Sequence, residues 1–257
     1  MNTVYAAAEE GIKIHLSAPV LGHFFGIPLT STLILAWVVI IILTLFAIST
    51  KYRLKLIPGK VQVIIELVVG GAYGYIADAL ESQDLARKFF PLIMSLFLFI
   101  LTANWLGLLP GVDAIGIFKT THGEDTLVPF LHPVNTDLNM TLGLTFVSFV
   151  TIELAGIFYL GLRKYGGKFF NFSSPLAFLI GIIELFSELA RLVSFSFRLF
   201  GNIFAGKTLI LVAIFFIPFV LPVPLLAFEL FVGFIQAFIF AVLTLFFIKL
   251  AIQEPEH

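Results

Sequence analysis

Five ionisable side chains interrupt one of the most apolar parts of this 257-residue chain, within positions 184–207. A charge at the centre of a bilayer helix costs about 2.5–3.5 kcal/mol on insertion scales, and such groups usually face protein or water and carry ions, protons or substrate. We therefore expect an ion pathway in this segment, where the charged residues are Glu184, Glu188, Arg191, Arg198 and Lys207.

Helical spacing distributes these groups over two faces. With 3.6 residues per turn, Glu184, Arg191 and Arg198 recur every seven residues and share one face. Asn202, four residues after Arg198, lies on that face, whereas Lys207 points to the opposite side. A single helix is thus predicted to present two polar faces inside an apolar environment.

Arg198 has two interpretations. Because the pKa of an arginine exceeds about 12, its charge is permanent, which suits an electrostatic barrier on an ion path and not a proton carrier. The alternative is a buried ion pair that holds helices together. Glu188 stands three residues before Arg191 and is placed to neutralise that arginine in the same way.

Glu184 and Glu229 are candidate proton relays, because burial raises the pKa of a carboxyl towards neutrality. They could instead be structural partners of Arg191 and Lys207. We interpret Lys207 as the counter-charge of Glu229, since an unpaired buried charge costs on the order of 3–5 kcal/mol.

The amides of Asn202 and Gln236 can line a water path or contact Arg198. The competing interpretation is a hydrogen bond between helices, which is worth only about 0.6 kcal/mol on average. The five histidines do not cluster at metal-ligand spacing, so we assign no metal.

Composition indicates the fold class. The chain is 60% hydrophobic and 12% charged, whereas a soluble domain has about 25% charged residues. Lipid must therefore cover much of its surface, and the long apolar runs predict an all-α, polytopic integral membrane protein. A net charge of −1 argues against a nucleic-acid-binding surface, and the absence of cysteine excludes disulfides and thiolate chemistry.

The apolar runs predict a single membrane domain. Lysine and arginine clusters at 51–60 and 163–168 mark the cytoplasmic side, so we expect the N-terminus outside and the C-terminus in the cytoplasm. The expected parts are an external segment at 1–28, spans at 29–50, 89–109 and 138–162, an interfacial amphipathic helix at 61–88, and long helical segments at 173–218 and 225–252.

The segment 173–218 is too long for one perpendicular span. At 1.5 Å per residue it would reach about 68 Å, twice a bilayer. Two arrangements remain open: two spans broken near the charges, or one long inclined helix. Pro218, Pro222 and Pro224 are expected to form the turn before the last helix.

The string SFRLFGNIFAG at 196–206 resembles the signature of subunit a of F-type ATP synthases. Three further strings are similar to that family's landmarks, in the same order: NWLGLLP at 104–110, DLN at 137–139 and QAFIF at 236–240. The resemblance implies a tilted helical hairpin against a ring of c subunits, and two aqueous half-channels that meet the ring at different places.

On that resemblance Arg198 separates the two half-channels. Glu229, Lys207 and Gln236 belong to the outer one, and Glu184 lies in or near the same path. The chain departs from the family form in which the position of Lys207 is acidic and that of Glu229 is a histidine. A form of swapped polarity, with histidine first and an acid second, also occurs in the family.

The resemblance also implies partners and location. The chain would perform no chemistry on ATP, need no cofactor, and assemble in a bacterial plasma membrane with the c ring, the peripheral-stalk b subunits and other ATP synthase subunits. The coupling ion, H⁺ or Na⁺, stays open. Two other classes remain: a stand-alone secondary transporter, which predicts inverted repeats that we do not find, and a structural membrane scaffold.

Overall fold

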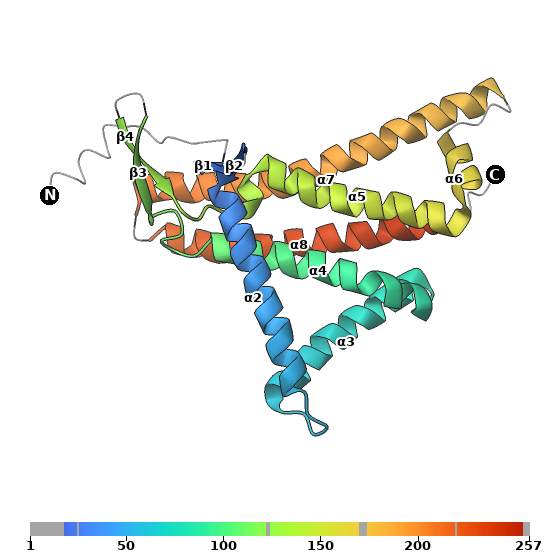
Figure 1. The fold of residues 1–257 in the computed structure, drawn as a ribbon, viewed down its shortest axis with the longest axis horizontal. Helices are drawn as coiled ribbons and strands as arrows, with labels where there is room; N and C mark the ends of the chain where they lie inside the picture. Colours follow the sequence, from blue (N-terminus) through green and yellow to red (C-terminus); the bar gives the residue numbers. More distant parts are fainter. Residues whose placement is uncertain (1–17, 25, 122–123, 170–173, 219, 254–257) are drawn as a thin grey trace.

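A computed structural model describes residues 18–24, 26–121, 124–169, 174–218 and 220–253. Within these ranges the fold is helical, with two small hairpins (Figure 1). The helices are α2 (Ser31–Arg53), α3 (Lys60–Leu80), α4 (Gln83–Gly107), α5 (Leu138–Leu160), α6 (Leu162–Phe169), α7 (Pro175–Phe216) and α8 (Pro222–Ile252). The strands are β1 (Val20–Phe24), β2 (Ile27–Thr30), β3 (Gly116–Thr121) and β4 (Glu124–Pro129), and a short 3-10 helix, η1, covers Val134–Thr136.

Six of these helices are long and apolar enough to cross a membrane, by length and composition: α2, α3, α4, α5, α7 and α8. This confirms the polytopic all-α fold class. The expected spans 29–50, 89–109 and 138–162 correspond to α2, to most of α4 and to α5.

Helix α7 is one unbroken helix of 42 residues, about 63 Å long. Ser174 caps it by accepting a hydrogen bond from the amide of Ala177 at 3.0 Å, and Pro175 occupies its first turn, where a missing N–H costs nothing. No proline follows before Phe216. The single long helix is therefore the arrangement that the chain adopts.

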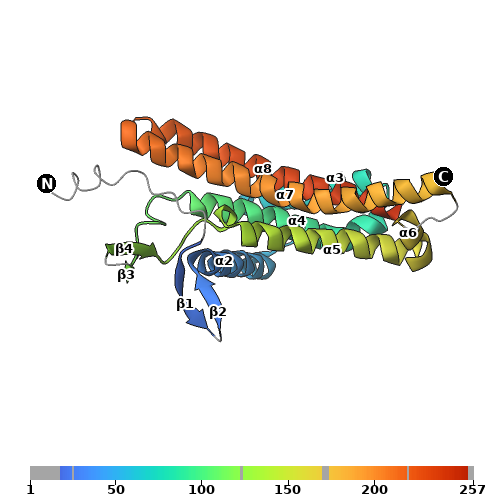
Figure 2. The ribbon, with the colours of Figure 1, turned by 90° about the horizontal axis from the view of Figure 1, so that it is seen from above.

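Helices α7 and α8 lie side by side along the long axis of the molecule (Figures 1 and 2). The prediction for the prolines between them was partly wrong. Pro222 and Pro224 belong to the first turn of α8, and the connection is made by the residues between Phe216 and Pro222. The reason is physical: proline fits the first helical turn, where its fixed φ is already helical.

Helices α4 and α5 complete a four-helix bundle with α7 and α8, as Figure 2 shows. Small polar side chains join the helices inside it: Thr141 meets Ser196 at 3.0 Å, and Ser148 meets Thr244 at 2.8 Å. Small polar residues at such contacts allow close packing in a membrane. Around them pack the buried residues Leu96, Ile100, Phe195, Leu199, Ala237 and Phe240.

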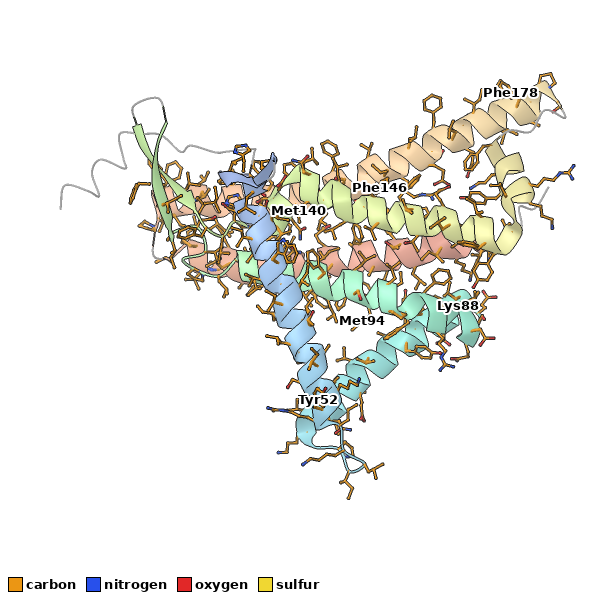
Figure 3. The ribbon with its side chains drawn as sticks, in the orientation of Figure 1. Tyr52, Lys88, Met94, Met140, Phe146 and Phe178 are labelled. Atoms are coloured by element: carbon orange, nitrogen blue, oxygen red, sulfur yellow. The ribbon has the colours of Figure 1, made fainter. Side chains whose placement is uncertain are left out.

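Helices α2 and α3 diverge from the bundle and meet each other at its side (Figure 1). Tyr52, at the end of α2, lies far from α7 and α8 (Figure 3). The expected interfacial helix 61–88 is divided: α3 ends at Leu80, Glu81 adopts a left-handed φ of 53°, and α4 starts at Gln83 with Ser82 as its cap. An interfacial position for α3 stays a prediction.

The connection between α4 and α5, which we call the outer connection (residues 108–137), folds over one end of the bundle. It carries the β3–β4 hairpin and η1, neither of which the sequence predicted. Helix α6 and the end of α8 lie at the opposite end of the long axis (Figure 1).

Candidate functional site

The two polar faces predicted for α7 are present in the structure. Arg198 and Asn202 are exposed on α7, whereas Lys207 is partly buried and meets the outer connection. Nine residues at 100° each turn the helix by two and a half revolutions, which explains the opposite directions.

Arg198 has no carboxylate partner within the described residues. Its Nη2 donates to Ser194 Oγ at 3.3 Å, one turn back, and its guanidinium lies 5.7 Å from the centre of the Phe195 ring. These contacts orient the side chain and leave its charge uncompensated. The interpretation of Arg198 as half of a structural ion pair therefore has no support in this structure.

Gln236 lies beside Arg198 across the α7–α8 contact. Both residues line a cavity of about 10 Å³ together with Phe195 and Leu199, and Gln236 is 9% exposed. The structure thus brings Arg198 and Gln236 together, with Asn202 one turn further along α7.

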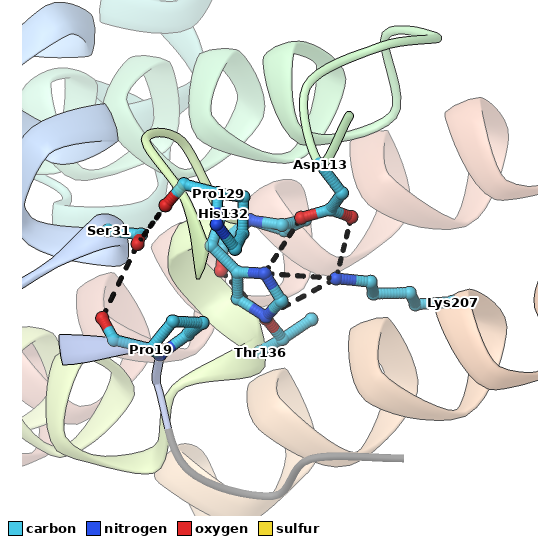
Figure 4. Close-up of polar contacts among 8 residues, drawn as sticks. Pro19, Ser31, Asp113, Pro129, His132, Thr136 and Lys207 are labelled. Carbon is cyan, nitrogen blue, oxygen red and sulfur yellow. Dashed lines mark hydrogen bonds and ion pairs between the residues drawn. The ribbon is translucent and has the colours of Figure 1, made fainter. Parts of the chain in front are cut away.

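Lys207 is neutralised by the outer connection. Its Nζ lies 2.9 Å from Asp113 Oδ2 and 3.3 Å from each ring nitrogen of His132 (Figure 4). His132 Nδ1 lies 2.8 Å from the other oxygen of Asp113. We call these three residues the outer cluster. Burial alone would raise the pKa of Asp113, but hydrogen bonds from His132 and Lys207 outweigh it and hold the pKa below its usual value.

The expected pairing of Lys207 with Glu229 was wrong. Glu229 is 4% exposed, and no described residue forms an ion pair or hydrogen bond with its carboxyl. That carboxyl lies against Gly206, where an added Cβ would come within 2.1 Å of Glu229 Cδ. Lys207 follows Gly206 directly but extends towards Asp113. Lys207 and Glu229 therefore face each other across the hairpin without forming a pair.

Asn104 and Trp105 attach α4 to α8 near Glu229. Asn104 Nδ2 donates to the carbonyl of Gly233 at 3.0 Å, and Trp105 Nε1 donates to that of Leu230 at 3.1 Å. Asn135 Nδ2 in turn donates to Asn104 Oδ1 at 2.7 Å. These bonds fix the part of α8 that carries Glu229.

A cavity of about 360 Å³ opens between the end of α4, the outer connection, α7 and α8. Asn104, Asp113, Thr136 and Lys207 are its polar lining residues. A water molecule needs roughly 10–15 Å³ of cavity volume, so this cavity has room for several water molecules. Its other lining residues are mostly apolar, and one of them, Leu226, precedes Glu229 by three residues on α8.

Glu184 lies at the other end of α7 and not in this path. It forms an ion pair with Lys168 of α6, and Lys207 is about 35 Å further along the helix. The structure therefore does not bring Glu184 together with Lys207 and Glu229. Four helices meet near Glu184, and the residues there, which we call the inner cluster, are Glu153, Tyr165, Lys168, Glu184, Glu188 and Arg191.

The inner cluster confirms one predicted pair. Arg191 Nη1 lies 2.5 Å from Glu188 Oε2, as the spacing of three residues predicted. Tyr165 Oη donates to Glu153 Oε2 at 2.9 Å. Burial and the nearby carboxylate of Glu153 raise the pKa of Tyr165 far above its usual value, so this hydroxyl stays protonated.

Sequence reasoning missed Asp113 and His132 as members of the site. One signal could have found them: the outer connection is rich in acidic residues, and Lys207 faces away from Arg198 and therefore needs an acid from elsewhere. Lys168 was noted only as a marker of topology.

Comparisons with known proteins agree with the geometry. The family model described as ATP synthase A chain matches residues 32–249. The chain is similar to ATP synthase subunit a of Gloeobacter violaceus, with 34% identity over 88% of this chain and 85% of the relative. It is also similar to ATP synthase subunit a of Mycobacterium marinum, with 32% identity over the full length of both, and of Moorella thermoacetica, with 30% identity over 88% of this chain and 92% of the relative.

The match covers α2 to α8 and includes Arg198, Lys207 and Glu229. The chain therefore belongs to the ATP synthase A chain family, whose members mediate proton translocation in the membrane sector of the enzyme.

Proposed function

We propose that the exposed face of α7 around Arg198 lies against a ring of c subunits, and that Arg198 separates two half-channels. The observation that carries this proposal is the uncompensated guanidinium, which no described carboxylate approaches. Facing lipid would cost it about 2.5–3.5 kcal/mol or more. A partner that presents a carboxylate at this depth removes that cost.

The surroundings of Arg198 support a helical partner. The neighbouring side chains on α7 are large and apolar, with Val193 51% and Phe197 53% exposed, and Asn202 is exposed one turn later. A ring of helices would cover Val193 and Phe197, and a carboxylate on it at the depth of Arg198 would contact Arg198 and Asn202.

The outer half-channel would pass through the cavity beside the outer cluster and end at Glu229 and Gln236. The inner half-channel would open near Glu184, in the inner cluster. Arg198 lies between them, about 21 Å from Glu184 and about 14 Å from Lys207 along α7. This assigns Glu184 to the inner path.

In operation, a proton enters one half-channel, neutralises a ring carboxylate, rides with the ring and leaves by the other. Arg198 attracts the carboxylate that has lost its proton and blocks direct passage between the channels. A membrane potential supplies about 2.3 kcal/mol per charge per 100 mV. A proton that leaked past Arg198 would dissipate this free energy without turning the ring. The chain itself would perform no chemistry on ATP.

Assembly and orientation belong to the same proposal. The chain would lie in a bacterial plasma membrane with α6 and the end of α8 in the cytoplasm and the outer connection outside, bound to the c ring and to peripheral-stalk b subunits. Lysine and arginine at 51–60 and 163–168 support this orientation.

Copurification tests the assembly. A tagged chain should bring down a c ring and the peripheral ATPase in stoichiometric amounts, and the complex in vesicles should couple ATP hydrolysis to a proton gradient. A chain that transports protons by itself, without a ring, would overturn the proposal.

A further inference from the structure

We propose that the outer cluster of Asp113, His132 and Lys207 collects protons for the outer half-channel, and that His132 is the group that accepts and releases them. This inference rests on the proposed function and deepens it by naming the entry site.

The three side chains come from three separate segments. Asp113 follows α4, His132 follows β4, and Lys207 belongs to α7. They meet with both oxygens of Asp113 in use, one at 2.8 Å from His132 Nδ1 and one at 2.9 Å from Lys207 Nζ (Figure 4). The carboxylate is thus held by both residues, and the imidazole is oriented by its own contacts to Asp113 and to Lys207.

The geometry assigns the hydrogens of His132. Nδ1 faces a carboxylate oxygen, so it carries the hydrogen and donates it to Asp113. Nε2 then has a lone pair, which can accept from Lys207 Nζ at 3.3 Å or from water. With a neutral imidazole the cluster has no net charge, and it can take up one proton at Nε2.

The carboxylates around the cluster do not take the place of His132 as the group that accepts and releases protons. Asp137, at the start of α5, accepts from Thr32 Oγ1 at 2.9 Å and from the amide of Asn139. Glu229, on α8, lies against Gly206 and is the next group along the path. Asp113 stays charged above pH 5, because its pKa lies below the usual value of about 3.9.

Histidine is the side chain that ordinarily changes charge between pH 5 and 8. In the proposed step, hydronium outside gives a proton to His132 Nε2, which gives it to water in the cavity of about 360 Å³ that its partners Asp113 and Lys207 line. The proton then reaches the Glu229 carboxylate. The carboxylate of Asp113 favours a proton on the His132 imidazole. The neighbouring ammonium of Lys207 disfavours that positive charge, so the imidazole does not retain the proton.

The experiment uses the whole ATP synthase in vesicles whose lumen corresponds to the outer side. The rate of ATP synthesis is measured at constant driving force while the pH on the outer side is varied from 5.5 to 8.5. His132→Gln removes the titrating group, Asp113→Asn loosens its orientation, and His23→Gln is the control, because His23 is exposed on β1 outside the cluster.

We expect His132→Gln to reach the wild-type rate at low outer pH and to fall about tenfold below it at high outer pH, where proton capture limits the rate. Asp113→Asn should shift the profile in the same direction by less, and His23→Gln should leave it unchanged. An unchanged profile in His132→Gln, or an equal loss at every pH, would overturn the inference.

Chemical rescue separates proton transfer from a structural role. Imidazole on the outer side should restore most of the rate of His132→Ala at high pH, because the cavity admits a small base, and should do nothing for Glu229→Gln. Absence of rescue in an assembled His132→Ala enzyme counts against proton transfer by His132. If Arg198→Ala is inactive while the His132 profile is unchanged, this inference fails alone; if Arg198→Ala couples normally, the proposed function fails.

Discussion

Lys207 Nζ lies 2.9 Å from Asp113 Oδ2, so a cation of the long helix α7 is neutralised from the outer connection and not by Glu229. The Glu229 carboxyl therefore has no fixed counter-charge, although it lies against Gly206, which directly precedes Lys207 on α7. This separation makes the roles of the two residues testable one by one.

Glu229→Gln should abolish proton transport while the complex assembles, because the change keeps the side-chain size and removes the titratable group. The structure predicts that adding Lys207→Leu does not restore transport, since Lys207 is not stranded by the first change. The measurement is ATP-driven acidification of vesicles. Recovery in the Lys207→Leu, Glu229→Leu double variant would show that the two form a functional ion pair after all.

Gly206→Ala should impair transport, because the new Cβ would occupy the position of the Glu229 carboxyl, 2.1 Å from Cδ. The carboxyl is the end of a flexible side chain, so we expect it to swing away and the protein to fold. Gly143→Ala, on α5 with nothing within 4 Å of the added Cβ and away from the proposed ring-facing side of α7, is the control. Transport rates of the two variants should differ by about tenfold or more, for a relay displaced by one ångström or so. Equal rates would show that the position of the Glu229 carboxyl does not matter.

Arg198→Ala should abolish ATP synthesis and ATP-driven pumping, because it removes the charge proposed to separate the half-channels. A passive proton leak should appear once the peripheral ATPase is stripped from the membranes. Arg198→Lys should rescue poorly, since burial can lower the pKa of a lysine and its charge is not guaranteed.

Arg163→Ala, at the start of α6, is the control for loss of an arginine and should pump normally. Near-normal coupled pumping by assembled Arg198→Ala would contradict the mechanism as a whole.

The proposed orientation can be read with single cysteines, because the chain has none of its own. Ala114→Cys, exposed on the outer connection, should react with an impermeant thiol reagent added to intact cells. Lys164→Cys, in α6, should react only after the membrane is opened. The reverse pattern would invert the topology and exchange the outer and inner clusters.

The sequence by itself determined the helices and the faces of α7. Apolar length and helical periodicity are local properties, so most of the long apolar helices, the opposite directions of Arg198 and Lys207, and the pair Glu188–Arg191 could be predicted. The separation of Glu184 from Lys207, about 35 Å, followed only once α7 was found to be one unbroken helix.

Only the tertiary structure decided the partner of Lys207 and the place of Glu229. Asp113 and His132 reach Lys207 because the outer connection folds over the end of the bundle, and no periodicity encodes where a connection of that length returns. Glu229 meets Gly206 because α7 and α8 approach closely at this glycine, where the absence of a side chain leaves room for the carboxyl. The charge of each residue is a property of its type, but its partner depends on packing between segments that are distant in the chain.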